Sequence, residues 1–326
     1  MNKKNNYQIG LASLPLCGFV LLILIYPVES YSGNALEKFS ELKEAGLLLV
    51  DNQGQSVVST HAKKSFIPAS ATKLVTAWLA LNHWGEGYHF RTHFYLDTST
   101  KTLWVKGSGD PFLVSEELDL ISKNLKQLGI RKINSIRLDV SFFQPNLITP
   151  GAGYSNNPYD AISTAIAGNF NTVAIKKMAG KIYSDELQTP LTPFAKSASK
   201  RIKVRALRIN TGRYSHDSER YFAELLTAFL RKHDVIVGDQ IIWGNIPHQQ
   251  TYYSHVNSKS LGEIIRPMMK YSTNFIANQL VLMLSAEKHH RPANFIDVQR
   301  YMEETLVHQF NWKGITLKEG AGLSRE

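Results

Sequence analysis

The sequence is almost without cysteine. Its 326 residues contain one, Cys17, and that residue lies in an apolar stretch near the N-terminus. The chain after residue 30 therefore offers no disulfide, no thiol nucleophile and no cysteine-ligated metal. Histidine does not replace it, because His289 and His290 lack a third ligand at suitable spacing and no His-Glu-x-x-His motif occurs. The sequence implies neither a metal ion nor an organic cofactor.

The sequence also has no low-complexity segments, and its charged residues do not cluster in one region. The net charge is +10, but the lysines and arginines are spread along the chain. A basic balance can favour anionic partners. The sequence has no recognition helix, zinc-finger spacing or aromatic RNA-binding signature, so we expect no nucleic-acid partner. Hydrophobic residues make up 43% of the chain, which is enough for one large or two modest cores.

The first thirty residues have the pattern of a secretory signal peptide. Two lysines precede an apolar run over residues 9–25, and residues 28–30 offer small side chains for cleavage. An uncleaved membrane anchor is the alternative, because the run approaches the length of a membrane span. Pro15 and Gly18 interrupt the run, which favours the cleaved form. We therefore expect an exported protein that loses residues 1–30, and a peripheral association with the membrane stays open.

The order of strand and helix patterns predicts a mixed α/β (α+β) fold. After the signal peptide, two strand patterns flank a polar turn at Gly54, and a strongly apolar helix follows. From residue 88 to 250 the pattern changes to shorter strands and frequent turns, and a helical pattern returns over residues 261–285. We predict an α/β body, built from residues 31–87 and 251–326, that is interrupted by a β-rich insertion at residues 88–250.

The stretch FIPASATKLVTAW, residues 66–78, places a serine and a lysine one helical turn apart. Residues three apart lie on the same face of a helix, so Ser70 and Lys73 would point the same way. The positive end of the helix dipole disfavours the charged lysine and favours a developing alkoxide. A lysine with a lowered pKa can take the serine proton, which is the Ser-Lys form of nucleophilic catalysis. The same spacing recurs three more times in the chain, so an isolated match is typical of an N-cap serine followed by a solvated lysine.

Five motifs nevertheless occur in the order found in one enzyme family. They are FIPASATKLVTAWLAL (66–81), KGSGDP (106–111), NFNTV (169–173), MMKYSTNFIANQL (268–280) and EGAGLSR (319–325). In these motifs the chain resembles the class C low-molecular-mass penicillin-binding proteins, the serine D-alanyl-D-alanine carboxypeptidase/endopeptidases. The Ser-x-x-Lys and Ser-x-Asn motifs are characteristic of their superfamily. The resemblance runs from about Leu47 onward. It implies a penicillin-binding/serine β-lactamase-like transpeptidase fold, with the insertion dividing the catalytic domain, and a periplasmic location.

The resemblance also implies roles for four residues. Ser70 would be the acylated nucleophile, and Lys73 would be its general base. Ser272 would relay the proton towards the leaving amine, and Asn274 would hold the peptide backbone of the substrate. The substrates would be peptidoglycan stem peptides, and β-lactams would acylate the same serine. Without the other motifs, Ser272 and Asn274 would be read as a helix cap and an exposed amide.

The third motif of the family, a Lys-Thr/Ser-Gly on a strand beside the active site, is missing from the sequence. NTGR at residues 210–213 lacks the lysine and precedes Ser272, so it cannot substitute. The motif supplies a cation for the terminal carboxylate of the substrate and one oxyanion donor, and losing one such donor costs about 2.7–4 kcal/mol of barrier. Because the motif follows GxGLSR in the family, we expect a chain truncated within the catalytic domain.

Two other functions therefore stay open. One is a catalytically inactive homologue that binds the cell wall or a partner. The other is a serine β-lactamase, against which the long insertion and the ordered motifs argue. The basic segment KSASKRIKVRALRI, residues 196–209, also alternates charged and apolar residues, so Arg201, Lys203 and Arg205 would share one face of a strand. Contact with anionic wall polymer is the functional interpretation of these cations, and a solvated strand face is the simpler one.

Overall fold

The computed structural model describes residues 32–247 and 250–325. The predicted signal peptide, residues 1–30, lies outside the described residues. The chain divides into two compact units, Met1–Phe66 and Ile67–Glu326. In the part of the chain that is described, no helix combines the length and the apolar character needed to cross a membrane.

The first unit contains one helix and one β-hairpin. Helix α1 spans Ser32–Ser40, and strand β1 (Leu47–Val50) pairs antiparallel with β2 (Ser56–Thr60). The turn between the strands contains Gly54 at φ 79°, a left-handed conformation that glycine adopts without a steric penalty. The two strands expected on either side of this glycine are confirmed.

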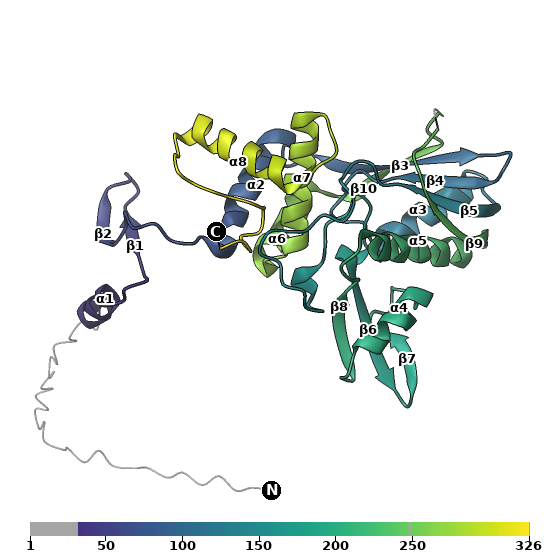
Figure 1. Ribbon diagram of the computed structural model, residues 1–326, viewed down its shortest axis with the longest axis horizontal. Helices are drawn as coiled ribbons and strands as arrows, with labels where there is room; N and C mark the ends of the chain where they lie inside the picture. The colour runs from purple at the N-terminus through teal and green to yellow at the C-terminus, as the bar shows by residue number, and fades with distance from the viewer. Residues whose placement is uncertain (1–31, 248–249, 326) are drawn as a thin grey trace, which may run out of the picture. The chain divides into compact units, whose positions relative to one another are not determined.

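A five-stranded mixed sheet forms part of the second unit (Figure 1). Its strands, in spatial order, are β10 (Tyr253–Ser260), β3 (His89–Asp97), β4 (Thr102–Lys106), β5 (Lys132–Asp139) and β9 (Ile236–Trp243). Strands β10, β3 and β4 run antiparallel, whereas β4, β5 and β9 run parallel. Four of the five residues of β4, the central strand of the sheet, are buried. Strands β3 and β4 follow each other in the chain and form a hairpin.

Two helices cover one face of this sheet. Helices α3 (Ser115–Gln127) and α5 (Ser215–Lys232) lie side by side beneath the strands (Figure 1). Their apolar faces join the strands in one core, which includes Leu118, Phe222 and Ile136. Both helices are strongly amphipathic in sequence, as expected for helices that bury one face against a sheet.

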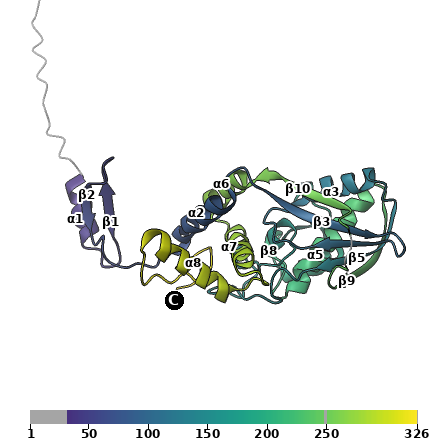
Figure 2. The same ribbon diagram turned by 90° about the horizontal axis from the view of Figure 1, so that it is seen from above.

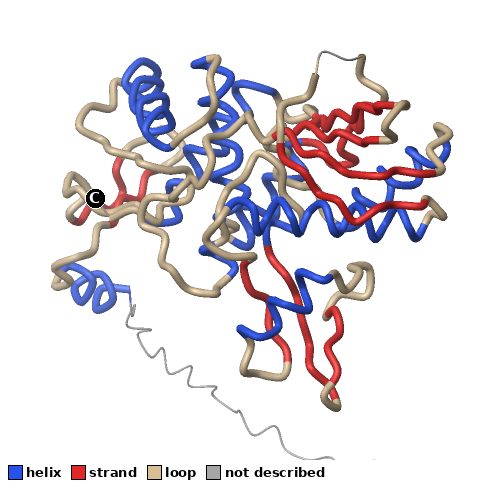
Figure 3. The backbone as a smooth tube through the Cα atoms, turned by 45° about the vertical axis from the view of Figure 1, so that its right-hand side comes forward, coloured by secondary structure: helices blue, strands red, loops and turns tan. Residues whose placement is uncertain are grey.

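A smaller antiparallel sheet lies on the other side of the helices (Figures 1 and 3). Its spatial order is β7 (Lys181–Ser184), β6 (Thr172–Met178) and β8 (Ala206–Asn210), and α4 (Pro193–Ala198) packs against it. The strand expected over residues 201–205 is wrong. A 3₁₀ turn ends at Arg201, and β8 begins only at Ala206. The Thr192 hydroxyl accepts a hydrogen bond from the Ala195 amide, and Pro193 occupies the first helical position, so the local sequence starts a helix there.

Four helices gather at the end of the second unit opposite the large sheet (Figure 2). They are α2 (Thr72–Trp84), α6 (Leu261–Tyr271), α7 (Asn274–His289) and α8 (Phe295–Phe310). Twelve consecutive residues of α7, Phe275–Ala286, are buried, and the other three helices pack around it. The single helical pattern over residues 261–285 is two helices, because the chain turns at Ser272.

The mixed α/β architecture confirms the predicted fold class. Strand β10 comes after residue 250 in the chain and pairs with β3, which comes just after residue 88. The large sheet thus contains strands from both sides of the boundary predicted at residue 250. The division of the catalytic domain at residues 88–250 stays a prediction.

Candidate active site

Ser70 lies in a single 3₁₀ turn, Ala69–Ala71, that leads directly into α2. The N-cap position of α2 is Ala71, and no side chain caps the helix. The Ser70 hydroxyl is therefore not the N-cap that an isolated match would suggest. Instead it receives two hydrogen bonds, from the Lys73 amine at 3.1 Å and from the Ser272 hydroxyl at 2.9 Å.

Lys73 is one of the most deeply buried polar residues of the chain, with 1% of its surface exposed. Its amine donates hydrogen bonds to the Ser70 hydroxyl and, at 2.8 Å, to the backbone carbonyl of Ala321. Burial lowers the pKa of Lys73, and the negative charge of Glu319 partly opposes this effect. The low pKa makes the neutral amine, which can accept a proton, more accessible near neutral pH.

Ser272 lies at the break between α6 and α7. Its backbone is left-handed, with φ 53° and ψ 45°, and the Thr273 amide bonds back to the Met268 carbonyl at 3.0 Å. A left-handed serine costs on the order of 1–3 kcal/mol, so the surrounding structure must hold it in place. In this conformation the Ser272 hydroxyl donates to the Ser70 hydroxyl, although the two residues are 202 positions apart in the sequence.

Asn274 is the first residue of α7, two residues beyond Ser272. Its side-chain amide donates to the backbone carbonyl of Tyr159 at 3.3 Å, and the residue is half-buried. Deeper in the same helix, the Gln279 side chain donates to the carbonyls of Gly109 and Thr164. These bonds fix the start of α7, and with it Asn274, against two loops from earlier in the chain.

The KGSGDP motif helps to hold α7 in place and forms no hydrogen bond with Ser70. The Gly109 carbonyl accepts the hydrogen bond from the Gln279 side chain, and the Gly109 amide donates to the Ala165 carbonyl at 2.8 Å. A Cβ atom at Gly107 would lie 2.8 Å from the backbone of Ala165, so only glycine fits. The buried Asp110 accepts hydrogen bonds from the Asn257 side chain and the Phe112 amide. Desolvation by burial raises the pKa of Asp110 to about 6.

The NFNTV motif supports the other side of α7. Asn169, Phe170 and Asn171 have φ angles of 49°, 61° and 52°, an unusual run of left-handed residues. The buried Asn171 amide donates to Thr164, and the Phe170 ring lies edge-on to Phe275 with centroids 6.2 Å apart. Phe275 directly follows Asn274. The motif therefore positions the start of α7.

The EGAGLSR motif contributes directly to the site, which the sequence analysis missed. The buried Glu319 accepts hydrogen bonds from the amides of Ala321 and Leu323 at 2.7 and 2.6 Å. This turn presents the Ala321 carbonyl to the Lys73 amine. Gly322 has φ 77°, and a Cβ atom there would overlap the carbonyl oxygen of Ala69, so the segment packs against the turn that carries Ser70. Gly322 was the sequence signal of this close approach, and Gly320 approaches Ala277 of α7 in the same way.

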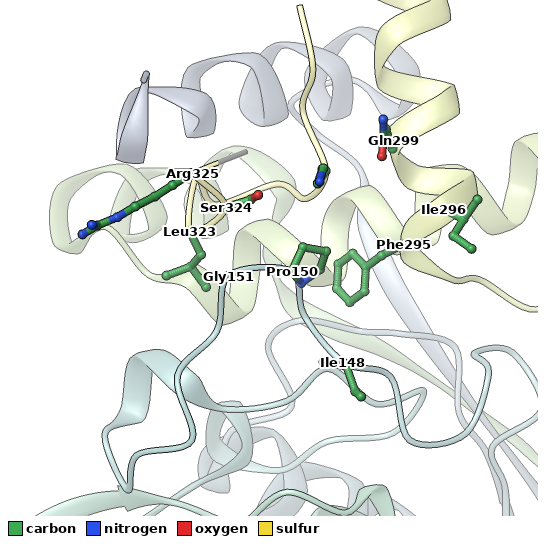
Figure 4. Close-up of a pocket in the computed structure, with 10 residues that line it drawn as sticks. Ile148, Pro150, Gly151, Phe295, Ile296, Gln299, Leu323, Ser324 and Arg325 are labelled. Carbon is green, nitrogen blue, oxygen red and sulfur yellow. The ribbon is translucent and has the colours of Figure 1, made fainter. Parts of the chain in front are cut away.

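The same C-terminal segment forms part of a pocket of about 600 Å³ (Figure 4). Its walls are mainly apolar and include Phe295, Ile296 and Leu323, together with Gln299. None of the four predicted site residues lines it. Among the described residues, no three His, Cys, Asp or Glu side chains gather that could hold a metal ion.

Three comparisons with known proteins agree on one group of enzymes. A profile of the D-Ala-D-Ala carboxypeptidase 3 (S13) family matches residues 34–182 and 201–326. The D-alanyl-D-alanine carboxypeptidase of Actinomadura sp. (strain R39) is 23% identical over 379 aligned residues, covering 97% of this chain and 70% of that protein. The D-alanyl-D-alanine carboxypeptidase DacB of Haemophilus influenzae is also 23% identical, covering 89% of this chain and 69% of that protein.

The solved structures show the same fold. The crystal structure of penicillin binding protein 4 (dacB) from Haemophilus influenzae has a TM-score of 0.66 at 22% identity and covers 84% of this chain and 69% of its own. A second crystal structure of that protein, complexed with a β-lactam, has a TM-score of 0.61. The expected penicillin-binding fold is confirmed.

Proposed function

Because this chain belongs to the D-Ala-D-Ala carboxypeptidase 3 (S13) family, we propose that it is a serine D-alanyl-D-alanine carboxypeptidase/endopeptidase of peptidoglycan stem peptides. One observation carries the proposal. The hydroxyl of Ser70 accepts hydrogen bonds from both the buried Lys73 amine and the Ser272 hydroxyl. A nucleophile that touches both a base and a second proton carrier is the arrangement that acyl transfer needs.

In the acylation step, Ser70 attacks the carbonyl carbon of the penultimate D-alanine. The neutral Lys73 amine takes the hydroxyl proton as the bond forms, and the Ala321 carbonyl keeps the resulting ammonium hydrogen-bonded. Burial favours the neutral amine that this transfer requires, since it lowers the pKa of Lys73. The peptide bond then breaks, and the acyl group stays on the Ser70 oxygen.

The leaving group needs a proton on the other side of Ser70. The Ser272 hydroxyl, which lies beside Ser70, gives its proton to the departing amine of the terminal residue, and the Lys73 ammonium returns to Ser272 the proton that it took from Ser70. The side-chain amide of the half-buried Asn274 binds the peptide backbone of the substrate. Water then hydrolyses the acyl-enzyme and restores the Ser70 hydroxyl.

A β-lactam test addresses the proposal directly. Purified protein is treated with fluorescent penicillin, and the adduct is counted by intact mass, with Ser70→Ala as the control. We expect one adduct per chain that the control abolishes. The alternative, an inactive homologue that binds the cell wall or a partner, is motivated by the missing Lys-Thr-Gly motif in the sequence. A folded protein that forms no adduct but sediments with isolated sacculi would favour that alternative.

The finer parts of the location stay proposals. We propose that the protein is exported to the periplasm after cleavage near residue 30, on the basis of the N-terminal sequence pattern. N-terminal sequencing of the mature protein tests this. A first residue near Tyr31 supports cleavage, and an intact Met1 in the membrane fraction supports the anchor.

A further inference from the structure

A second pocket of about 600 Å³ is lined by residues between 191 and 243, and none of the four residues of the candidate active site lines it. Its volume falls within the range of about 300–1,000 Å³ typical of small-molecule sites. Helix α5, strand β9 and the segment that precedes α4 form its walls. The lining residues are Leu191, Thr192, Pro193, Arg220, Glu224, Thr227, Ala228, Arg231, Asp239, Ile241 and Trp243.

Trp243, the last residue of β9, provides a flat and rigid wall. One face of its indole stacks on His216, with ring centroids 4.7 Å apart and planes inclined by 19°. Its ring nitrogen donates a 2.5 Å hydrogen bond to the largely buried Glu219. The ring is half-buried, and these two contacts fix its plane. The pocket therefore contains an aromatic surface whose orientation is set before any ligand arrives.

Two arginines provide polar groups in the same pocket, and each is held by a carboxylate. The Arg220 side chain donates to Glu224 at 2.9 Å, and the second Glu224 oxygen accepts from the Phe194 amide at 2.6 Å. The Arg231 side chain donates to Asp239 at 2.7 Å. The two arginine side chains remain 57% and 49% exposed, so they can still donate to a ligand. The charges balance, with two cations and two anions.

We propose that this pocket binds a neutral sugar unit of the glycan strand that carries the stem peptides. A pyranose ring has an apolar face of C–H groups, which fits an aromatic plane, and a rim of hydroxyls, which fits fixed donors and acceptors. An anionic peptide would instead require an unpaired cation, and both arginines of this pocket are already paired. The identity of the sugar polymer rests on the proposed function.

A glycan site on the inserted region would keep the enzyme on its polymer. A second attachment point raises the effective concentration of the stem peptides at Ser70 without any new contact at that site. It would also let the enzyme act on intact sacculi better than on isolated peptides.

The test uses a tetramer of β-1,4-linked N-acetylglucosamine, a neutral probe, titrated onto the purified protein in a calorimeter. Ala228→Leu fills the pocket from α5, and Arg231→Gln removes one donor. Arg137→Gln is the matched control. Arg137 stacks on Trp104, and its neighbours Ile136 and Leu138 point into the core between the sheet and α5, so Arg137 lies on the opposite face of the sheet. We expect at least tenfold weaker binding in both pocket variants and unchanged binding in the control.

Several results would overturn the proposal. These are no binding to the wild-type protein, equal binding by folded pocket variants, or displacement of the probe by sugar-free stem peptide. Thermal melting of each variant shows whether it is folded. If Ala228→Leu does not fold, Arg231→Gln still tests the proposal. Penicillin labelling is read separately. Probe binding without Ser70 labelling would contradict the proposed function alone, and labelling without probe binding would contradict this inference alone.

Discussion

The protonation state of Lys73 decides whether Ser70 can be activated. Burial lowers the pKa of Lys73, while the nearby Glu319 carboxylate raises it, and burial is the larger effect. Only the neutral amine can take the Ser70 proton. The rate of acylation by penicillin is therefore expected to rise with pH and to level off below pH 10.5, the ordinary lysine pKa.

The measurement is the second-order rate constant of acylation between pH 6 and 10. Lys73→Arg is the companion variant, because a guanidinium stays protonated over this range. We expect it to acylate about 10²–10⁴-fold more slowly. A profile without any dependence on pH, or a fully active arginine variant, would show that Lys73 is not the base.

Gly322 offers a test of how tightly the C-terminal segment is packed. Both Gly322 and Gly314 have positive φ angles, 77° and 74°, so alanine strains either backbone by about 1–2 kcal/mol. A Cβ atom at Gly314 meets nothing, whereas at Gly322 it overlaps the Ala69 carbonyl. Gly322→Ala is therefore expected to destabilise the protein beyond that backbone strain and to slow acylation by displacing the Ala321 carbonyl from Lys73.

Gly314→Ala should lose only the stability that the backbone strain costs, and should keep its acylation rate. Urea denaturation and penicillin labelling of both variants provide the comparison. Equal losses in the two variants would mean that the segment can move away from Ala69 at little cost.

The sequence predicted the local part of this site better than the distant part. Ser70 and Lys73 are three residues apart, so helical geometry alone placed them together. Ser272 reaches Ser70 only through the tertiary fold, and its place in the site came from the family resemblance. The contact of Lys73 with Ala321, 248 residues away, was not predicted, because a backbone carbonyl carries no sequence signature.

The same distinction holds for whole elements. The apolar periodicity over residues 261–285 is continuous, and the break at Ser272 depends on a left-handed residue that the pattern cannot show. The basic run failed for a different reason. Alternating charges suggested a strand from Arg201, but Thr192 and Pro193 start a helix, and the 3₁₀ turn that follows this helix continues to Arg201. The strand β8 then begins only at Ala206.

Among the described strands, the β1–β2 hairpin of the first unit is expected to be the least protected from exchange. It has two short strands, and Leu48, Leu49 and Val57 are more than half exposed. A two-stranded hairpin without a buried face is marginally stable in water. Its backbone amides should therefore exchange with deuterium much faster than those of β4 and β5, which lie inside the large sheet. Mass spectrometry of peptic peptides measures both, and equal protection would show that the hairpin is held by further contacts.

At the scale of the whole molecule, buried polar groups connect the sheet to the helices around the active site. Asp110 follows β4 and binds Asn257 of β10, and the adjoining Gly109 binds Gln279 of α7. The Glu117 side chain, at the start of α3, contacts His255, which is also on β10. These two side chains are only 3% and 4% exposed. These groups make the junction specific, and they also make it sensitive to pH.

The stability of this junction should depend on Asp110 in a particular direction. Burial raises the pKa of Asp110 to about 6, so the folded chain holds this proton more tightly than the unfolded chain. The stability that it contributes is full below the unfolded pKa and is lost as the pH rises through about 6. A shift of this size corresponds to on the order of 3 kcal/mol. Glu219 has a raised pKa and acts in the same direction, whereas Glu117 has a lowered pKa and loses stability only in more acidic solution.

Asp110→Asn isolates this contribution, since the amide oxygen can still accept from the Phe112 amide but cannot titrate. The free energy of unfolding is measured in urea at pH 4.5, 6 and 7.5 for both proteins. Between pH 4.5 and 7.5 the wild-type protein should lose stability relative to the variant, because only the wild type must bury a carboxylate at the higher pH. Parallel curves would mean that water or movement of the loop solvates Asp110, and the junction would then be more open than its contacts indicate.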